Sequence, residues 1–193
     1  MYFNNNPGDI MDARNIAVDY VQYRLRKHGY MWQNGPAMEG VSSEIFQTMR
    51  SLCDEFEERY HSQFDEMCEQ LDITPNTAYP TFHAVANELF GNGINWGRIV
   101  ALFTFGGSLA VKCNEKQIPL LVDNIVDWMS TYVKNNLNQW IASQNGWDGF
   151  VEFYAQGQER RNESPWPSLK QICGYAVGAI GVLTLGAILT QKS

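Results

Sequence analysis

One short pattern in the sequence has the spacing of a metal-binding motif. Glu58 and His61 are three residues apart, which is the ExxH arrangement that di-iron helical bundles use. Such a centre needs two copies of the motif and further carboxylates, whereas neither His28 nor His83 has a glutamate three residues before it. We therefore expect no metal site and no cofactor.

The residues that could support catalysis are equally sparse. Gly91, Gly93 and Gly97 loosely resemble a phosphate-binding loop, but their spacing is GxGxxxG and they follow a helical pattern instead of a strand. We interpret this segment as a turn. The sequence has no GxSxG elbow, no Walker lysine motif and no cysteine with an evident histidine partner. We predict that the protein is not an enzyme.

Composition narrows the class of protein further. The chain has 193 residues, of which 45% are hydrophobic and 13% aromatic, enough for one folded domain with a short appendage. A net charge of -7 argues against a nucleic-acid binder, which needs a surplus of Lys and Arg. The four cysteines are Cys53, Cys68, Cys113 and Cys173, and no two of them form a CxxC motif. This pattern is typical of reduced thiols in the cytosol.

Arg98 is the residue whose chemistry most needs an explanation. It is the only charged residue between positions 96 and 111, a segment so apolar that it must be enclosed by other helices. A guanidinium there should not stay buried without a partner. Two interpretations remain open: an intramolecular pair with an acid such as Glu88, or a position at the lip of a groove where Arg98 meets an incoming carboxylate.

The elements that must position Arg98 are helices. Residues 10–27 show apolar residues at helical spacing, carry basic residues at the end and stop at Gly29, and a loop follows to residue 40. A long helix begins near Ser42 or Ser43. Its apolar residues recur at steps of three and four and so share one face: Ile45, Met49, Leu52, Phe56, Tyr60, Phe64 and Met67. Seven acids between residues 54 and 69 read as a solvated opposite face.

The second half of the chain also predicts helices. Residues 73–77 form a break with capping residues, and the next helix, with Pro80 in its first turn, runs to about residue 90. Gly91 and Gly93 allow a left-handed C-cap and a tight turn, and Asn95 can cap the central apolar helix. A long helix over 118–141 and a short one from 146 to 154 follow. No segment alternates with period two, so we expect an all-α bundle around one hydrophobic helix.

The last part of the sequence resembles a membrane anchor. Nineteen residues, 172–190, carry no charge and lie between Lys170 and Lys192, and as a helix they match the roughly 30 Å hydrocarbon core. We therefore expect a leader over 1–9, a helical domain over 10–160, a linker over 161–171 and a C-terminal transmembrane helix. Gly174 and Gly178 form a GxxxG pattern, which can let two such helices approach closely, so homo- or heterodimerisation is a hypothesis.

Four segments of the chain resemble the homology motifs of the Bcl-2 family. Residues 88–100, continuing to Phe105-Gly106-Gly107, resemble the first motif, 140–154 the second, 49–56 the third and 15–32 the fourth. Residues 73–79 add to a resemblance to Bcl-2 and Bcl-x, which points to the pro-survival branch. Two departures are Cys53, where the third motif usually has glycine, and a short loop after the first helix.

The resemblance implies a Bcl-2-like helical bundle that holds the amphipathic death-motif helix of pro-apoptotic relatives, both multi-motif effectors and single-motif proteins. Its groove would lie between helices two to five and the short helix after Gly146. Arg98 would pair with the ligand's aspartate, and Gly97 would let the ligand backbone approach. By position, the groove residues would be Phe56, Tyr60, Phe64, Met67, Val85, Glu88, Leu89, Asn95, Gly97, Arg98, Phe105 and Tyr154.

The family also implies a location and leaves alternatives. The anchor resembles those of the mitochondrial outer membrane facing the cytosol, and the endoplasmic reticulum is a second candidate. The same fold would suit a pore-forming effector whose hairpin, residues 95–141, enters the bilayer. A third hypothesis is a tail-anchored scaffold that binds no death motif.

Overall fold

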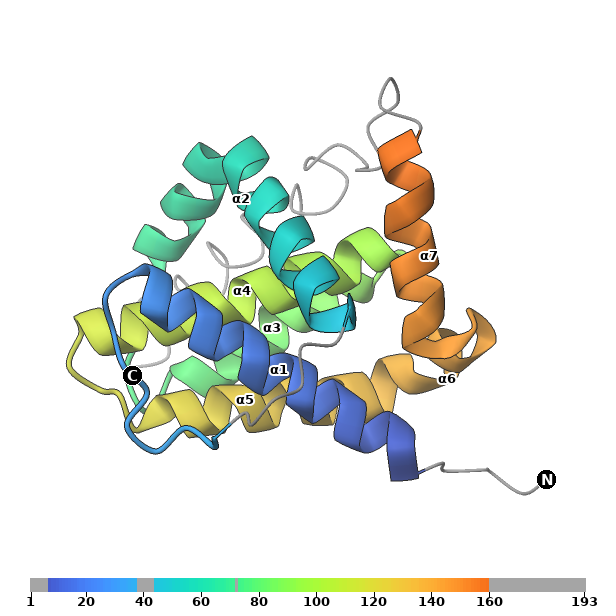
Figure 1. The fold of residues 1–193 in the computed structure, drawn as a ribbon. Helices are drawn as coiled ribbons and strands as arrows, with labels where there is room; N and C mark the ends of the chain where they lie inside the picture. Colours follow the sequence, from blue (N-terminus) through green and yellow to red (C-terminus); the bar gives the residue numbers. More distant parts are fainter. Residues whose placement is uncertain (1–6, 38–43, 72, 160–193) are drawn as a thin grey trace, which may run out of the picture.

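The chain folds as a bundle of helices (Figure 1). The computed structural model describes residues 7–37, 44–71 and 73–159, and within these ranges it contains no strand, as predicted. The helices are α1 (Pro7–Lys27), α2 (Glu44–Gln70), α3 (Ala78–Phe90), α4 (Trp96–Glu115), α5 (Leu121–Tyr132), the π-helical segment η1 (Val133–Leu137), α6 (Asn138–Ser143) and α7 (Gly146–Glu159).

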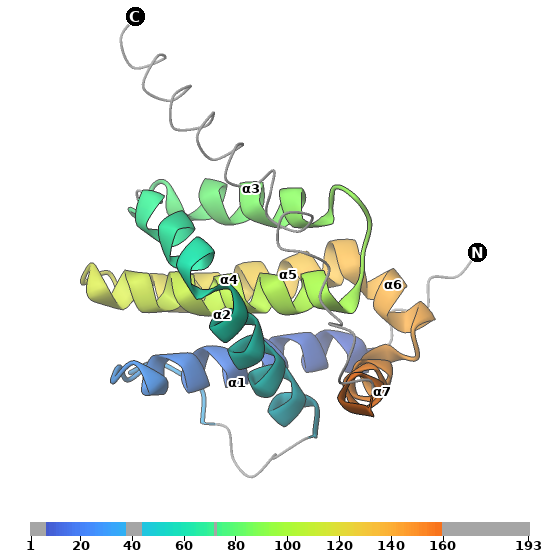
Figure 2. The same cartoon turned by 90° about the horizontal axis from the view of Figure 1, so that it is seen from above.

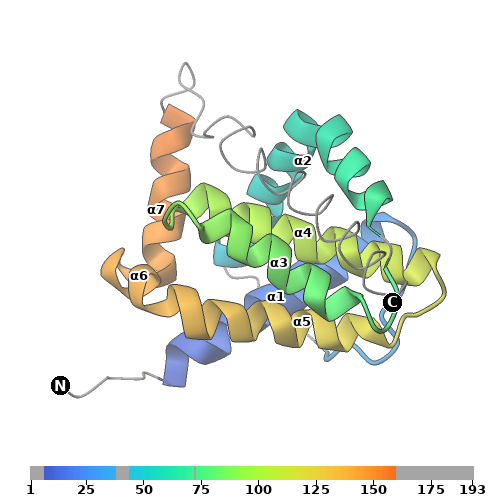
Figure 3. The same ribbon diagram turned by 180° about the vertical axis from the view of Figure 1, so that it is seen from behind.

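Helix α4 is the centre of the bundle, which confirms the prediction from its apolar sequence. It packs against α1, α2, α3 and α5, and nearly every side chain along it is buried. Viewed from above, α3 and α1 lie on opposite sides of α4 (Figure 2). Viewed from behind, α3 runs beside both α4 and α5 (Figure 3). A helix that is apolar all round is thus satisfied by neighbours on all sides.

Two consecutive glycines allow α4 to lie this close to its neighbours. A Cβ atom on Gly106 would stand 2.2 Å from the sulfur of Met129 on α5. A Cβ on Gly107 would stand 2.7 Å from a ring carbon of Tyr20 and 2.9 Å from Cγ of Arg24, both on α1. The Gly-Gly pair therefore sets the spacing of α4 against α1 and α5 together.

Helix α2 confirms part of the predicted apolar stripe and adds a kink. Met49, Leu52, Phe56 and Tyr60 are buried, and Ile45 is half-buried. The side chains of Phe64 and Met67 lie outside the described residues. At Tyr60 the backbone leaves helical geometry, with φ -120° and ψ 19°, so α2 consists of two segments. Periodicity alone gave one straight helix.

The turns around α3 follow the predicted capping chemistry with one correction. The amide of Thr74 donates to Oγ1 of Thr77 (2.9 Å) and the amide of Thr77 donates to Oγ1 of Thr74 (3.2 Å) before α3 begins. Gly93 has φ +102°, the left-handed conformation expected there. Gly91, however, has φ -57°, so the prediction of a left-handed C-cap at that glycine was wrong. The helix simply ends in right-handed geometry.

Several predicted boundaries moved. Helix α1 begins at Pro7, inside the expected leader, and α7 continues past Tyr154 to Glu159. The long helix expected over 118–141 begins at Leu121 and is interrupted by η1. A π-helical segment of this kind has no signature in hydrophobic spacing.

The segments predicted as linker and anchor, 161–171 and 172–190, lie outside the described residues, as does most of the expected leader. Among the helices that the structure describes, none is both long enough and apolar enough to cross a bilayer.

Cys53 and Cys113 are free and buried, and burial raises the pKa of their thiols to about 12 and about 11. Both thiols are therefore protonated at neutral pH.

Candidate functional site

Ten of the twelve predicted groove residues have described side chains, and they lie on four helices and in the turn before α4; the side chains of Phe64 and Met67 lie outside the described residues. Helices α2 and α3 both pack against α4, and α7 packs against α2. In Figure 1, α2 and α7 rise from the same side of α4. The residues are Phe56 and Tyr60 on α2, Val85, Glu88 and Leu89 on α3, Asn95 before α4, Gly97, Arg98 and Phe105 on α4, and Tyr154 on α7.

The apolar members of this set belong to the hydrophobic core. Phe56, Tyr60, Val85, Leu89 and Phe105 are between 0% and 9% exposed. Tyr154 on α7 is half-buried against the same core. These side chains are therefore part of the core of the bundle. A ligand that binds them must contact the small part of their surface that is exposed, or displace the residues that cover them.

Arg98 is buried and has no acidic partner among the described residues. It is 9% exposed, and one guanidinium nitrogen donates to the carbonyl oxygen of Gly93. Its Nε is buried without an acceptor. Glu88 is half-buried, and no described ion pair joins it to Arg98, so the structure does not support the intramolecular pair. A buried guanidinium with unused donors is costly unless a further acceptor arrives.

Asn95 has a structural task beside its predicted ligand contact. Its side-chain oxygen accepts a hydrogen bond of 2.9 Å from the amide of Arg98 and so caps α4. This confirms the predicted N-cap and leaves only the amide nitrogen of Asn95 free to donate to a ligand. The cap also fixes the backbone from which the Arg98 side chain leaves.

An aromatic cluster that sequence reasoning missed attaches α7 to the start of α4. The ring of Trp96 lies 5.9 Å from that of Trp147 and 5.3 Å from that of Phe150, and 4.9 Å from Trp140 of α6. Such ring pairs add about 0.5 to 1.5 kcal/mol each beyond the area they bury. The aromatic residues Trp140, Trp147 and Phe150 of the predicted second motif were the available signal. The cluster holds α7 beside the first turn of helix α4, and this turn includes Arg98.

In the part of the chain that the structure describes, no group of three or more His, Cys, Asp or Glu side chains could hold a metal ion. A small hollow of about 120 Å³ lies between Trp32 of the loop after α1 and Pro119 and Val122 near the start of α5. It does not include any of the predicted site residues. Polar chemistry at the candidate site therefore centres on Arg98.

Comparison with known proteins identifies the family. The sequence model of "Apoptosis regulator proteins, Bcl-2 family" matches residues 49–147, which runs from the third motif through the first and into the second. The chain belongs to the Bcl-2 family. It is therefore an apoptosis regulator and not an enzyme, as the lack of catalytic motifs predicted.

Relatives of the chain extend this family assignment over almost its whole length. It is 43% identical to Bcl-2-like protein 1 of Gallus gallus over 232 aligned positions, covering 93% of this chain and 98% of the relative. It is also 43% identical to apoptosis regulator Bcl-2 of Canis lupus familiaris, covering 94% of this chain and 96% of the relative. These similarities confirm the predicted resemblance to Bcl-2 and Bcl-x.

A solved structure has the same fold. The crystal structure of Trichoplax adhaerens trBcl-2L2 bound to trBak BH3 matches with a TM-score of 0.70 and 35% identity. The match covers 76% of this chain and 99% of that chain. The helical bundle described above is therefore the Bcl-2 fold.

Proposed function

We propose that this Bcl-2 family member is a pro-survival regulator that sequesters the amphipathic death-motif helix of pro-apoptotic relatives, and so prevents permeabilisation of the mitochondrial outer membrane. The similarity to Bcl-2 and Bcl-2-like protein 1 supports the branch. The solved relative bound to a BH3 segment supports the mode of binding. Laying the apolar face of an amphipathic helix into a hydrophobic groove is a recurring mode of peptide recognition, and the binding of BH3 segments by Bcl-2 proteins is a known case of it.

The observation that carries the proposal is the state of Arg98. Its guanidinium is buried beside the α3–α4 turn with one backbone acceptor, an unused Nε and no carboxylate among the described residues. A ligand aspartate would supply the missing charge partner. Ligand helices without the aspartate would leave the guanidinium desolvated and unpaired, which gives selectivity as well as affinity.

The proposed site keeps the twelve residues predicted from the sequence. Apolar anchors of the ligand would bury surface against the aromatic and aliphatic members, and Glu88, Asn95 and Arg98 would make the polar contacts. Gly97 would leave room for the ligand backbone. The binding partners would be both multi-motif effectors and single-motif proteins.

Binding of a synthetic death-motif peptide to the full chain tests this proposal. Calorimetry should give saturable one-to-one binding, and the same peptide with its aspartate changed to asparagine should bind more weakly. Absence of binding to a panel of such peptides would refute the proposal and favour the scaffold hypothesis.

A liposome assay distinguishes the pro-survival role from the pore-forming alternative. The purified chain should not release dye by itself, and it should suppress the leakage that a pore-forming relative causes. Dye release by the chain alone would reverse the assignment.

We further propose that residues 172–190 anchor the protein in the mitochondrial outer membrane, with the endoplasmic reticulum as a second site and the helical domain facing the cytosol. The uncharged run and its flanking lysines support this. A fluorescent fusion lacking 172–190 should become diffuse in the cell. Dimerisation through Gly174 and Gly178 would be disproved if Gly178→Leu left detergent-extracted oligomers unchanged.

A further inference from the structure

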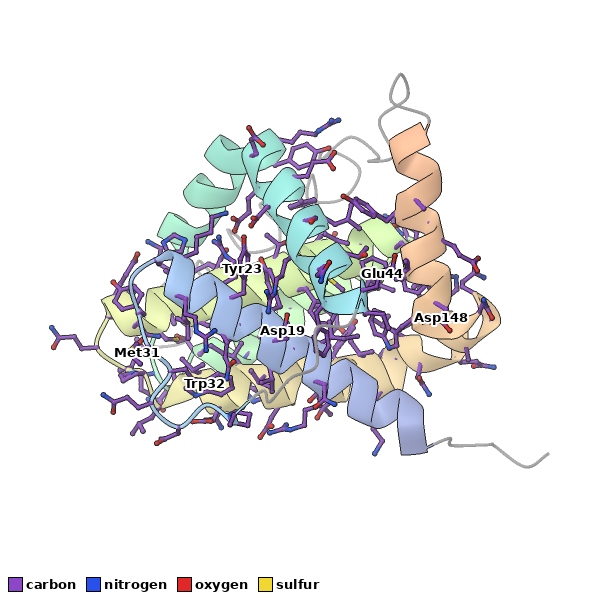
Figure 4. All side chains as sticks on the ribbon, in the orientation of Figure 1. Asp19, Tyr23, Met31, Trp32, Glu44 and Asp148 are labelled. Atoms are coloured by element: carbon purple, nitrogen blue, oxygen red, sulfur yellow. The ribbon has the colours of Figure 1, made fainter. Side chains whose placement is uncertain are left out.

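A polar network joins α1 to α2 on the N-terminal side of the α2 kink. Its α2 members are Arg50, Asp54 and Glu57, at spacings of four and three, so they lie on one face of that helix. They meet four residues of α1: Asp19, Tyr23, Arg24 and Lys27. We call these seven residues the α1–α2 ladder. Asp19 and Tyr23 are labelled on α1 in Figure 4, where α1 crosses under α2.

The contacts of the ladder are specific and paired. Arg50 Nε donates to Asp19 Oδ2 at 2.8 Å, and a second nitrogen of Arg50 contacts the other oxygen, so the pair is bidentate. Lys27 Nζ donates to Asp54 Oδ1 at 2.9 Å, and the hydroxyl of Tyr23 donates to Oδ2 of the same carboxylate. A bidentate pair and a doubly bonded carboxylate both restrict orientation.

Part of the ladder is shielded from solvent, so the loss of one partner there would leave a buried charge unpaired. Arg24 and Glu57 form an ion pair in which their side chains are only 6% and 19% exposed, and Asp19 is also buried. The guanidinium carbon of Arg50 lies 5.2 Å from the ring centre of Tyr23. Burial, followed by the hydrogen bond to Asp54, raises the pKa of Tyr23 to about 12, so its hydroxyl remains a donor at neutral pH.

The position of the ladder relates it to the proposed groove. All three α2 members precede Tyr60, where the helix leaves regular geometry. Phe56, a proposed groove residue, lies between Asp54 and Glu57 in sequence and is fully buried on a different face of the same segment. Rotation of this segment about its own axis would move Phe56, and the ladder opposes such a rotation through contacts at three successive positions.

We infer that the α1–α2 ladder is a positioning device for ligand recognition: it fixes the rotation of α2 before the kink and thereby the direction of Phe56 and Tyr60. Asp19, Tyr23 and Asp54 are then positioning residues that touch no ligand. This inference rests on the proposed function, because it concerns the wall of the same site. A merely structural ladder would stabilise the fold and leave the affinity of the folded protein unchanged.

The test compares peptide affinity with stability in the full chain. Tyr23→Phe removes one hydroxyl and keeps the ring, and Asp54→Asn removes one charge and keeps the shape. Glu58→Gln is the matched control, because Glu58 is an exposed acid on the same segment with no described ion pair. Each protein is titrated with the death-motif peptide, and its free energy of unfolding is measured in urea.

If the ladder is a positioning device, each of the two ladder variants should bind the peptide about tenfold more weakly while more than 90% of the protein is still folded. Unfolding lowers the apparent affinity only in proportion to the loss of folded protein, so it could not explain such a change. Combined in one chain, the two changes should be less than additive, and Glu58→Gln should change affinity less than about twofold. Lower stability with wild-type affinity would overturn the inference alone. Absence of peptide binding by the wild-type chain would refute the proposed function and the inference with it.

Discussion

The guanidinium of Arg98 donates a hydrogen bond to the carbonyl oxygen of Gly93, five residues earlier in the turn between α3 and α4. Gly93 has φ +102°, a conformation that residues with a Cβ rarely adopt. The residue proposed to pair with the ligand is thus oriented by a turn that only glycine forms easily. This links two parts of the first homology motif that the sequence pattern presents separately.

Gly93→Ala should therefore affect stability and binding together. Backbone strain should lower the free energy of unfolding by about 1 to 2 kcal/mol, and displacement of the carbonyl should weaken peptide binding. Urea denaturation and calorimetry measure the two effects. Gly91→Ala is the control, because Gly91 has φ -57° and a Cβ there would be 3.5 Å from its nearest neighbour. Equal effects of both substitutions would contradict the role given to the turn.

Asn95 offers a way to separate capping from ligand contact. Asn95→Ala should lower the free energy of unfolding by about 1 kcal/mol, because the amide of Arg98 loses its acceptor. Asn95→Ser should restore most of this stability, since a serine hydroxyl caps a helix as well as an amide does. Thermal unfolding followed by circular dichroism measures both. If serine rescues stability but not peptide affinity, the amide nitrogen of Asn95 contacts the ligand.

Gly107 should tolerate no side chain, because α1 lies directly against it. Gly107→Ala should cost about 1 to 3 kcal/mol by overpacking against Tyr20 and Arg24. Tyr20→Leu in the same chain should recover part of this loss, so that the two changes are less than additive. Urea unfolding of the four proteins of this cycle gives the coupling. Strict additivity would mean that the contact with Tyr20 does not limit the site.

Breaking the Arg24–Glu57 pair should produce a pH-dependent loss of stability. Arg24→Met keeps the aliphatic stem but leaves Glu57 buried beside no cation, which should cost about 2 to 3 kcal/mol at pH 7.5. Burial already raises the pKa of Glu57 against the opposing attraction of Arg24, and the substitution raises it further. This loss of stability arises only when the Glu57 carboxylate is ionised, so it is complete at pH values above the pKa of Glu57 in the folded variant.

The same penalty should vanish as Glu57 becomes protonated. The gap between wild type and Arg24→Met should shrink as the pH falls towards the ordinary glutamate value of about 4.3, where both states bind the proton. Urea unfolding at a series of pH values measures this gap, in which all other titrations cancel. Arg26→Ala, at an exposed position, should show no pH-dependent difference. A constant gap for Arg24→Met would contradict the buried pair.

Hydrophobic spacing was sufficient for the parts of the fold that local rules control. The unbroken apolar run of α4 predicted a central helix, and the residues around positions 91 to 95 predicted the turn and its cap. Arg98 also stood out without any structure, because a lone charge in such a run needs a partner. These features depend on neighbours within a few residues in sequence.

Features that depend on how helices meet were not predicted. The acids at Asp54 and Glu57 read as part of a solvated face, but α1 covers them and their charges are paired with Lys27 and Arg24. That interpretation was wrong for these two residues. The kink at Tyr60 and the π-helical segment Val133–Leu137 were missed for a related reason, since tertiary packing decides them and apolar periodicity does not change there.

A double-mutant cycle between Arg98 and the aspartate of a death-motif peptide tests the central claim most directly. Calorimetry is run on wild-type and Arg98→Ala proteins, each with the native peptide and with its aspartate-to-alanine variant. We expect Arg98→Ala to weaken binding of the native peptide by about 2 to 5 kcal/mol and to have little effect on the variant peptide. Equal binding of the native peptide by both proteins, or additive effects of the two changes, would contradict the account.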